Sequence, residues 1–258
     1  MSLRRYDWAE TCFGIAYASS PGNANVLEAL EFIAIERGDE VLRRHWLEAR
    51  MTVNPDSPEL LRAHAHLLAK MGDMEAERDV LRLEALGLDT PADRSLLSGL
   101  RARAGSRSEA LEAIEEAIAE DPTQAADWLS YANLLYEEGE SSKALDAADK
   151  CLEIDRQCGG AWALTATILA PKQNRLKEAL KAAIHAVALD SGGVDLVLLK
   201  ADLLLADGQA TAAEESLVKS LEKDAMNGEL RARIATRYLL DGRPEDAQNL
   251  LDTTPVGI

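Results

Sequence analysis

Glycine recurs along the chain at intervals of about 34 residues, and this period limits the fold more than any other feature. The series is Gly38, Gly72, Gly105, Gly139, Gly208 and Gly242, with spacings of 34, 33, 34, 69 and 34 residues. The interval of 69 contains one omitted glycine at Gln173-Asn174, where Pro171 and one additional residue replace the glycine turn. Such a period, kept over most of a chain, is typical of stacked two-helix repeats.

Small residues recur at fixed distances from these glycines. Five residues after the glycine position come Ala110, Ala144, Ala179, Ala213 and Ala247. Seven residues before the glycine come Ala65, Ser98, Ala132, Ala201 and Ala235. Seven residues after the first series come Ala117, Cys151, Ala186, Ser220 and Thr254. Small side chains let two helix backbones approach closely, and a leucine in such a place costs about 1–3 kcal/mol.

Each period is predicted to form two helices joined by the glycine turn. Trp128, Tyr131, Ala132 and Leu135 follow the i, i+3, i+4, i+7 spacing of one helical face. Gly139 can adopt the left-handed conformation that ends a helix, and Ser141 and Ser142 are candidates for capping the next helix. The buried face of that second helix is predicted to contain Ala144, Leu145, Ala148, Cys151 and Leu152.

These features resemble the tetratricopeptide repeat (TPR) family, whose unit is a helix–turn–helix of about 34 residues. Residues 125–158 match its pattern with Trp128, Tyr131, Ala132, Gly139, Ala144, Cys151 and Asp155, and residues 159–193 match with Trp162, Ala166, Ala179 and Ala186. The resemblance implies an all-α, right-handed superhelical solenoid that binds other proteins. An aromatic content of 4% and an apolar fraction of 47%, much of it Ala and Leu, also favour closely packed helices over strands.

Seven repeats are predicted after an N-terminal half-repeat helix at residues 1–23. Their limits are 24–57, 58–90, 91–124, 125–158, 159–193, 194–227 and 228–258. The first two depart most from the pattern, because Arg43 and Arg50, and Glu77 and Glu84, stand at the two small-residue positions of the second helix. We therefore expect their helices to pack more loosely or with a shifted register.

Both ends of the predicted array are open. Residues 1–23 supply a second helix without its first, and residues 252–258 are too short for a polar capping helix. Because a repeat is stabilised mainly by its neighbours, two explanations stay open. The chain is a piece of a longer protein, or another subunit, such as a second copy, covers the ends.

The charge balance limits the kinds of partner. The net charge is −17 and the isoelectric point is near 4.7, which disfavours nucleic acid and anionic membranes because both attract clustered Lys and Arg. No apolar run approaches the roughly 20 residues needed for direct membrane insertion, and the first residues lack a signal-peptide pattern. The three cysteines fit a reducing compartment, which favours the cytoplasm, and the periplasm stays open if a signal was removed.

No catalytic or metal-binding motif is found in the sequence. The i, i+2 spacing of His64 and His66 places them on different sides of a helix, where they cannot share a metal ion. HExxH, GxSxG and glycine-rich phosphate-loop motifs are absent. We therefore expect a chain without catalytic residues, metal or other cofactor.

The resemblance places a protein partner on the concave face, which the first helices of TPR units line. In residues 125–158 the side chains expected there are Leu129, Asn133 and Tyr136, at i, i+4 and i+7. With their equivalents, the predicted binding residues are Phe32, His66, Leu129, Asn133, Tyr136, Thr167, Leu198, Asp202, Leu205 and Leu239. The Lys, Asn and Arg cluster with which some family members bind acidic C-terminal tails is not supported, since the units after Asn133 supply no basic groove residue.

Two functions stay open. An apolar groove fits an extended peptide or an amphipathic helix, so the first is a non-catalytic scaffold or adaptor. The second is a repeat arm, or fragment, of a larger bacterial-type enzyme or of an envelope secretion or pilus assembly protein. The groove leucines also have an alternative role, which is to pack against neighbouring repeats.

Overall fold

The computed structural model describes residues 3–189 and 193–252. All regular structure in these residues is helical, with fifteen α-helices and one short 3-10 helix, which confirms the all-α prediction. The chain divides into two compact units, Met1–Pro122 and Thr123–Ile258.

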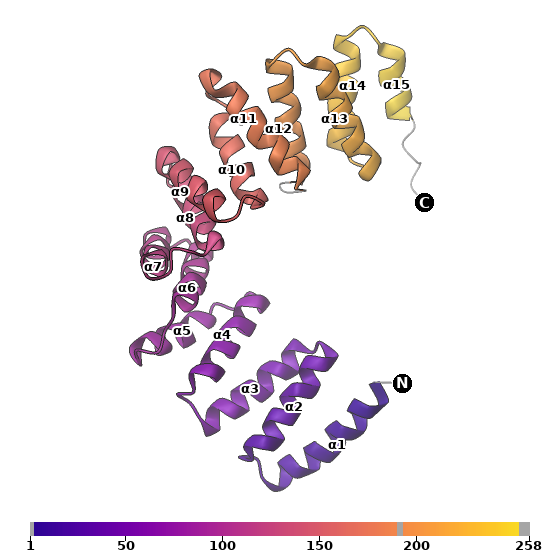
Figure 1. Cartoon of the computed structure of the whole chain (residues 1–258). Helices are drawn as coiled ribbons and strands as arrows, with labels where there is room; N and C mark the ends of the chain where they lie inside the picture. Colours follow the sequence, from indigo (N-terminus) through magenta and orange to yellow (C-terminus); the bar gives the residue numbers. More distant parts are fainter. Residues whose placement is uncertain (1–2, 190–192, 253–258) are drawn as a thin grey trace. The chain divides into compact units, whose positions relative to one another are not determined.

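The first unit consists of one single helix followed by three helix pairs (Figure 1). Its helices are α1 (Leu3–Ser19), α2 (Ala24–Arg37), α3 (Glu40–Val53), α4 (Pro58–Met71), α5 (Ala76–Ala85), α6 (Pro91–Ala104) and α7 (Arg107–Glu120). α1 packs on α2, and α2–α3, α4–α5 and α6–α7 form pairs. The second helix of one pair packs on the first helix of the next, as α3 does on α4.

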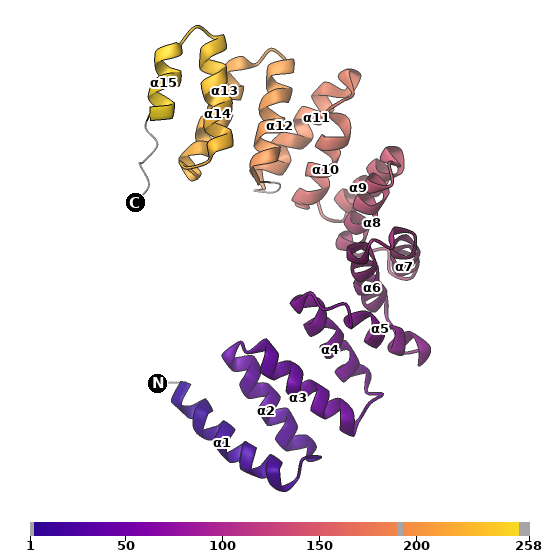
Figure 2. The same cartoon turned by 180° about the vertical axis from the view of Figure 1, so that it is seen from behind.

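The second unit contains four helix pairs, which follow one another in chain order (Figures 1 and 2). Its helices are α8 (Ala125–Glu137), α9 (Ser141–Ile154), α10 (Gly159–Leu169), α11 (Leu176–Ala188), α12 (Gly193–Ala206), α13 (Ala210–Lys223), α14 (Gly228–Leu240) and α15 (Pro244–Asp252). The pairs are α8–α9, α10–α11, α12–α13 and α14–α15, and each stacks on the next along the chain.

The periodic glycines form the turns within most pairs. Gly139 has a φ angle of 82°, a conformation that costs glycine little because it has no β-carbon. Its N–H donates to the Tyr136 carbonyl at 3.0 Å, and the Glu140 N–H donates to the Leu135 carbonyl at 2.9 Å. Where the glycine is omitted, between α10 and α11, the 3-10 helix Gln173–Arg175 makes the turn instead.

Among the described residues, side-chain caps begin five helices, but the cap predicted for α9 is wrong. The capping side chains are those of Asn23, Asp39, Ser57, Thr90 and Asn227. A cap must precede the first helical residue, and α9 already begins at Ser141. Glu140 therefore holds the cap position, and it makes no side-chain capping hydrogen bond.

The small residues of the repeat pattern lie where helices meet. Ala132 of α8 and both Ala144 and Cys151 of α9 have no exposed surface. The same holds for Ala166, Ala179 and Ala186 in the next pair. The predicted phase of the repeat is therefore confirmed in residues 125–189.

A buried ionic cluster replaces the small-residue contact in the pair α2–α3. Glu31, seven residues before Gly38, is only 5% exposed. The guanidinium groups of Arg43, at 3.8 Å, and of Arg50 pair with its carboxylate. A buried carboxylate is tolerated when ion pairs and hydrogen bonds compensate its lost hydration, so a charged contact connects α2 and α3 at these small-residue positions.

α5 shows the shifted register expected for residues 58–90. Ala76, Val80 and Leu83 are buried, with exposed fractions of 1% or less. These positions come one residue earlier than the small-residue positions, at which Glu77 and Glu84 stand. Because one residue turns a helix by about 100°, the shift takes both glutamates off the packed face.

Three expectations concern residues outside those the structure describes. They are the boundary that ends repeat 159–193, where residues 190–192 lie, the small residue Thr254, and the uncapped end at residues 253–258. The limits of the seven repeats and the handedness of the superhelix stay predictions.

Candidate protein-binding faces

The predicted binding residues all lie on first helices of pairs, and we call the surface they form in each unit the first-helix face. On this face Phe32, His66, Asn133, Tyr136, Thr167, Asp202 and Leu239 are exposed. Leu129, Leu198 and Leu205 are half-buried. The largest exposed apolar surfaces are those of Phe32 (54%), Leu239 (58%) and Tyr136 (39%).

Phe32 lines an apolar cavity of about 500 Å³ between α1 and α2. The opposite wall comes from α1, through Tyr6, Ala9 and Phe13. The Tyr6 hydroxyl donates to Glu36 at 2.9 Å, and this bond raises the pKa of Tyr6. The half-repeat helix therefore contributes to the first-helix face of its unit, a contribution that sequence analysis did not foresee.

A second cavity, of about 460 Å³, lies beside α12. Asp202 lines it together with Ala170, Leu176, Leu199 and Leu203. Leu198 and Leu205 are not among its lining residues. Sequence analysis missed Leu199 because α12 is apolar around most of its circumference, so spacing does not decide which leucine faces which neighbour.

Two of the predicted residues take part in contacts between first helices. Asp202 forms an ion pair with Arg233 of α14. Leu129 of α8 lies against Gly160 of α10, where an added β-carbon would be 2.9 Å from the Leu129 Cδ2 atom. The alternative role of the leucines, packing against the neighbouring repeat, therefore applies to Leu129.

The polar residues Asn133 and Thr167 are exposed in neighbouring pairs of the second unit. The Thr167 hydroxyl donates to the Ala163 carbonyl of its own helix at 2.9 Å, which leaves its oxygen able to accept a hydrogen bond. Asn133 and Thr167 are thus available for polar contacts, and Asn133 lies one helical turn from exposed Tyr136.

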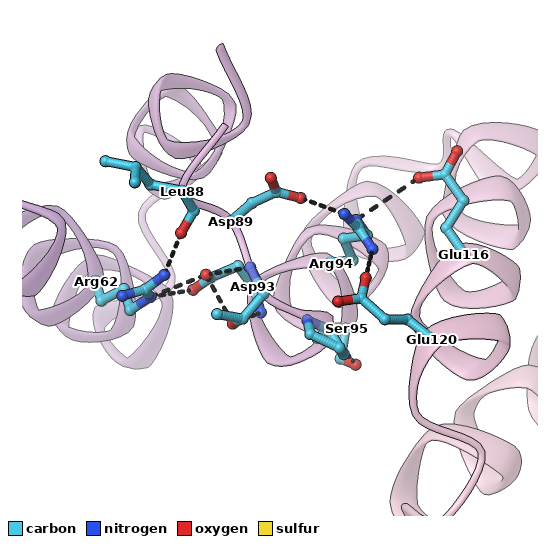
Figure 3. A network of polar contacts seen from close by, with 10 residues as sticks. Arg62, Leu88, Asp89, Asp93, Arg94, Ser95, Glu116 and Glu120 are labelled. Carbon is cyan, nitrogen blue, oxygen red and sulfur yellow. Dashed lines mark hydrogen bonds and ion pairs between the residues drawn. The ribbon is translucent and has the colours of Figure 1, made fainter. Parts of the chain in front are cut away.

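In the first unit, polar groups of the first helices bind to one another (Figure 3). The Arg62 Nε atom of α4 donates to Asp93 of α6 at 2.9 Å, and its guanidinium also donates to the Leu88 carbonyl. Asp93 is 2% exposed and also caps α6 with Thr90. Arg62 is therefore occupied within the fold, whereas His66 of the same helix is exposed.

The neighbouring Arg94 is the centre of an acidic cluster (Figure 3). Its guanidinium lies 2.8 Å from Asp89 and 3.9 Å from Glu116, and it also pairs with Glu120. The hydrogen bond to Glu120 contributes most to the raised pKa of Arg94. These contacts connect α6 to the preceding turn and to α7.

A buried His–Asp pair lies inside the first unit. His64 of α4 and Asp79 of α5 are 1% and 3% exposed, and His64 Nδ1 lies 2.6 Å from Asp79 Oδ2. His66, two residues later, is exposed. The two histidines therefore point in different directions, as their spacing indicated.

Within the described residues, no group of three or more His, Cys, Asp or Glu side chains is arranged to hold a metal ion. No helix in the same part of the chain is both long and apolar enough to cross a bilayer.

The sequence matches no protein-family model and no curated protein, whereas its fold matches solved structures. The C-terminal part of a TPR repeat-containing protein from Cytophaga hutchinsonii is similar with a TM-score of 0.70 at 14% identity, over 88% of this chain and 95% of that one. PilW, a type IV pilus biogenesis factor, gives 0.67 at 17% identity over 81% and 97%. YrrB, described as a TPR protein with an unusual peptide-binding site, gives 0.55 at 14% identity over 70% and 93%.

The chain has the TPR fold.

Aromatic residues of the TPR pattern hold helices together in this fold. The Trp162 ring of α10 stacks on His185 of α11, with centroids 4.7 Å apart and planes inclined by 25°. The Trp162 Nε1 atom donates to the Arg156 carbonyl at 2.9 Å. This tryptophan therefore connects the two helices of its own TPR pair to the turn that precedes them.

Proposed function

We propose that this chain is a non-catalytic scaffold that binds a peptide or an amphipathic helix of a partner protein on the first-helix face of its second unit. The observation that carries the proposal is the apolar surface of that face, where Tyr136 and Leu239 are 39% and 58% exposed. They lie on α8 and α14, the outermost first helices of the unit, and large exposed apolar side chains are typical of interaction sites.

The composition of the face fits a segment with spaced apolar side chains. Half-buried Leu198 and Leu205 lie one helical turn on either side of exposed Asp202. Aliphatic contacts of this kind supply affinity, and Asn133 and Thr167 can hydrogen-bond to a peptide backbone. The similarity of the fold to YrrB, with its peptide-binding site, supports the same class of partner.

The test is affinity capture from a lysate of the source organism, read by mass spectrometry. Wild type is compared with Leu198→Glu/Leu205→Glu and with a control, Ile154→Glu/Leu189→Glu. The control adds the same charge at apolar residues that lie outside the first-helix face and are 43% and 38% exposed. We expect a partner that wild type and control retain and the Leu198/Leu205 variant loses, with unchanged helicity by circular dichroism.

Retention by all three proteins would mean that the partner binds elsewhere. Loss by both variants would mean that added negative charge, rather than a particular face, determines binding. Either result contradicts the proposed location.

A second candidate function is that of an arm in a larger assembly or homo-oligomer. It is favoured by the outer surface of α1, where Trp8 and Ile15 are 73% and 66% exposed and lie two helical turns apart. Sedimentation of wild type beside Trp8→Ser/Ile15→Ser tests it for self-association. We expect wild type to sediment as an oligomer and the variant as a monomer, and a monomeric wild type would exclude the homo-oligomer.

A further inference from the structure

The cavity between α11, α12 and α13 has a volume of about 570 Å³ and two walls of opposite character. α11 contributes an aliphatic wall of Ile184, Val187 and Ala188. α13 contributes a polar and basic wall of Ser216, Lys219, Ser220 and Lys223, which share one face at i, i+3, i+4 and i+7. Val194, Val197 and Lys200 of α12 also line the cavity. The volume is within the range usual for ligand sites.

Positive charge gathers here in an acidic part of the protein. Residues 125–258 contain 14 basic and 22 acidic residues, and three of the basic ones line this single cavity. Lys200 and Lys219 form no ion pair with any residue that the structure describes. The carboxylate of Asp224, at the edge of the cavity, accepts a hydrogen bond from Asn227 at 3.2 Å.

Lys200 is held in an unfavourable environment for a cation. Burial lowers its pKa, and the charge of Lys219 lowers it further. A lysine in such a place costs stability unless an anion compensates it. Lys200 and Lys219 belong to different helices, so the fold itself brings these like charges together.

We propose that this cavity binds a peptide segment of a partner in which acidic residues alternate with aliphatic ones. Carboxylates pair with Lys200 and with Lys219 of α13, and an aliphatic side chain packs on Ile184 and Val187. The ammonium groups of Lys200 and Lys219 stand on two different helices, so a segment with several carboxylates matches them better than a single carboxylate does. This site lies outside the first-helix face, and it does not depend on the function proposed for that face.

The test is a direct binding measurement with the full-length chain. The probe is a short synthetic peptide of alternating glutamate and leucine, fluorescently labelled and with both ends blocked, titrated by fluorescence anisotropy in low salt. Two further peptides replace glutamate by glutamine or leucine by alanine. We expect binding of the first peptide alone, with an affinity that falls as salt is added.

Matched protein variants locate the binding. Lys200→Gln/Lys219→Gln removes two charges from the cavity. Lys177→Gln/Lys181→Gln removes two from exposed positions of α11 that do not line it. Loss of one charge-assisted hydrogen bond weakens binding by about tenfold, so we expect the affinity of Lys200→Gln/Lys219→Gln for the peptide to fall by at least this factor. For Lys177→Gln/Lys181→Gln we expect a change in affinity of less than roughly twofold, because salt screens the charge of these distant lysines. Ile184→Ala/Val187→Ala tests the aliphatic wall, and we expect weaker binding there too.

Thermal unfolding without peptide supplies an independent measurement. If Lys200 is a strained cation that serves binding, Lys200→Gln raises the melting temperature by roughly 2 °C. A melting temperature equal to or below that of wild type would overturn the proposal. So would equal affinities of the two lysine variants, or no binding of the glutamate–leucine peptide by wild type at about 1 mM, the weak end of specific recognition.

Discussion

At the scale of single residues, burial of a cysteine side chain in the repeat controls how readily its thiol reacts. Burial in α9, with Cys158 nearby, raises the pKa of Cys151 to about 12, whereas Cys12 on α1 is exposed. Because the thiolate is the reactive form, we expect iodoacetamide at about pH 8, near the ordinary thiol pKa, to modify Cys12 and leave Cys151 intact until the chain is unfolded. Peptide mass spectrometry before and after denaturation measures this, and modification of Cys151 in the folded protein would contradict it.

The buried pair of His64 and Asp79 gives a second prediction at this scale. His64→Leu leaves the Asp79 carboxylate buried without its hydrogen-bond partner, and removing one member of such a pair costs about 3–5 kcal/mol. The double variant His64→Leu/Asp79→Leu removes both polar groups, so we expect it to be more stable than His64→Leu alone. Urea unfolding of the two single variants and the double variant measures the coupling. Additive losses would show that the pair does not act as a unit.

At the scale of helices, close approach depends on small residues. Ala132 is completely buried in α8, whereas Ala206 at the end of α12 is exposed. A leucine at position 132 must push α8 and α9 apart, at a cost of about 1–3 kcal/mol. We expect Ala132→Leu to lower the melting temperature and Ala206→Leu to leave it nearly unchanged. Equal effects of the two substitutions would contradict the role of Ala132 in the close approach of α8 and α9.

A second prediction for helices concerns pH. Arg44 of α3 lies 2.7 Å from Glu48 and 2.7 Å from Asp73, which follows α4. The hydrogen bond from Arg44 contributes most to the lowered pKa of Glu48. For Asp73, a hydrogen bond from the Glu75 backbone N–H lowers the pKa most, and Arg44 adds to it.

Because the folded pKa values are lowered, these carboxylates stabilise the fold above their unfolded values of 4.5 and 3.8. The stabilisation is lost as pH falls through the lower, folded values. We therefore expect Arg44→Ala to be less stable than wild type at neutral pH, with a difference that shrinks on acidification below those values. Urea unfolding at several pH values tests this, and a constant difference would exclude a role for the two carboxylates.

Features that recur from one repeat to the next could be predicted from the sequence. The prediction was wrong or missing where a single residue departs from the repeat pattern. Gly139, Ala132 and Ala144 could be placed because their neighbours in other units mark the same phase. Glu31 could not, since nothing in its spacing indicates that a buried carboxylate stands where an alanine belongs, although Arg43 and Arg50 in the facing helix were a signal. Ser141 failed as a cap because the start of a helix depends on one residue.

The binding face was harder to predict than the fold. Phe32, Tyr136 and Leu239 are exposed as an interaction surface requires, but Leu129 packs on Gly160 and Asp202 pairs with Arg233. Spacing along one helix places a side chain on a face, and it does not reveal which groups of the next helix compete for that side chain. The cavity around Lys200 is formed by three helices, so no pattern within the sequence of a single helix predicts it.

At the scale of the whole molecule, the division into two units predicts independent folding. In a repeat array each pair is stabilised mainly by its neighbours, and both units contain several stacked pairs. We expect separately produced fragments 1–122 and 123–258 to be helical by circular dichroism and to unfold cooperatively on heating. A fragment without a cooperative transition would contradict this expectation.

The rotated helix α5 has a consequence for the engineering of this chain. Replacing Glu77 and Glu84 by alanine would make repeat 58–90 look more like its family, yet neither alanine would reach the interior. Glu77 now lies 3.2 Å from Arg101 of α6, so the substitution would discard a contact and gain no packing. The one-residue shift of α5 thus changes which sequence positions face the interior, so a consensus averaged over aligned repeats would misdirect design at this helix.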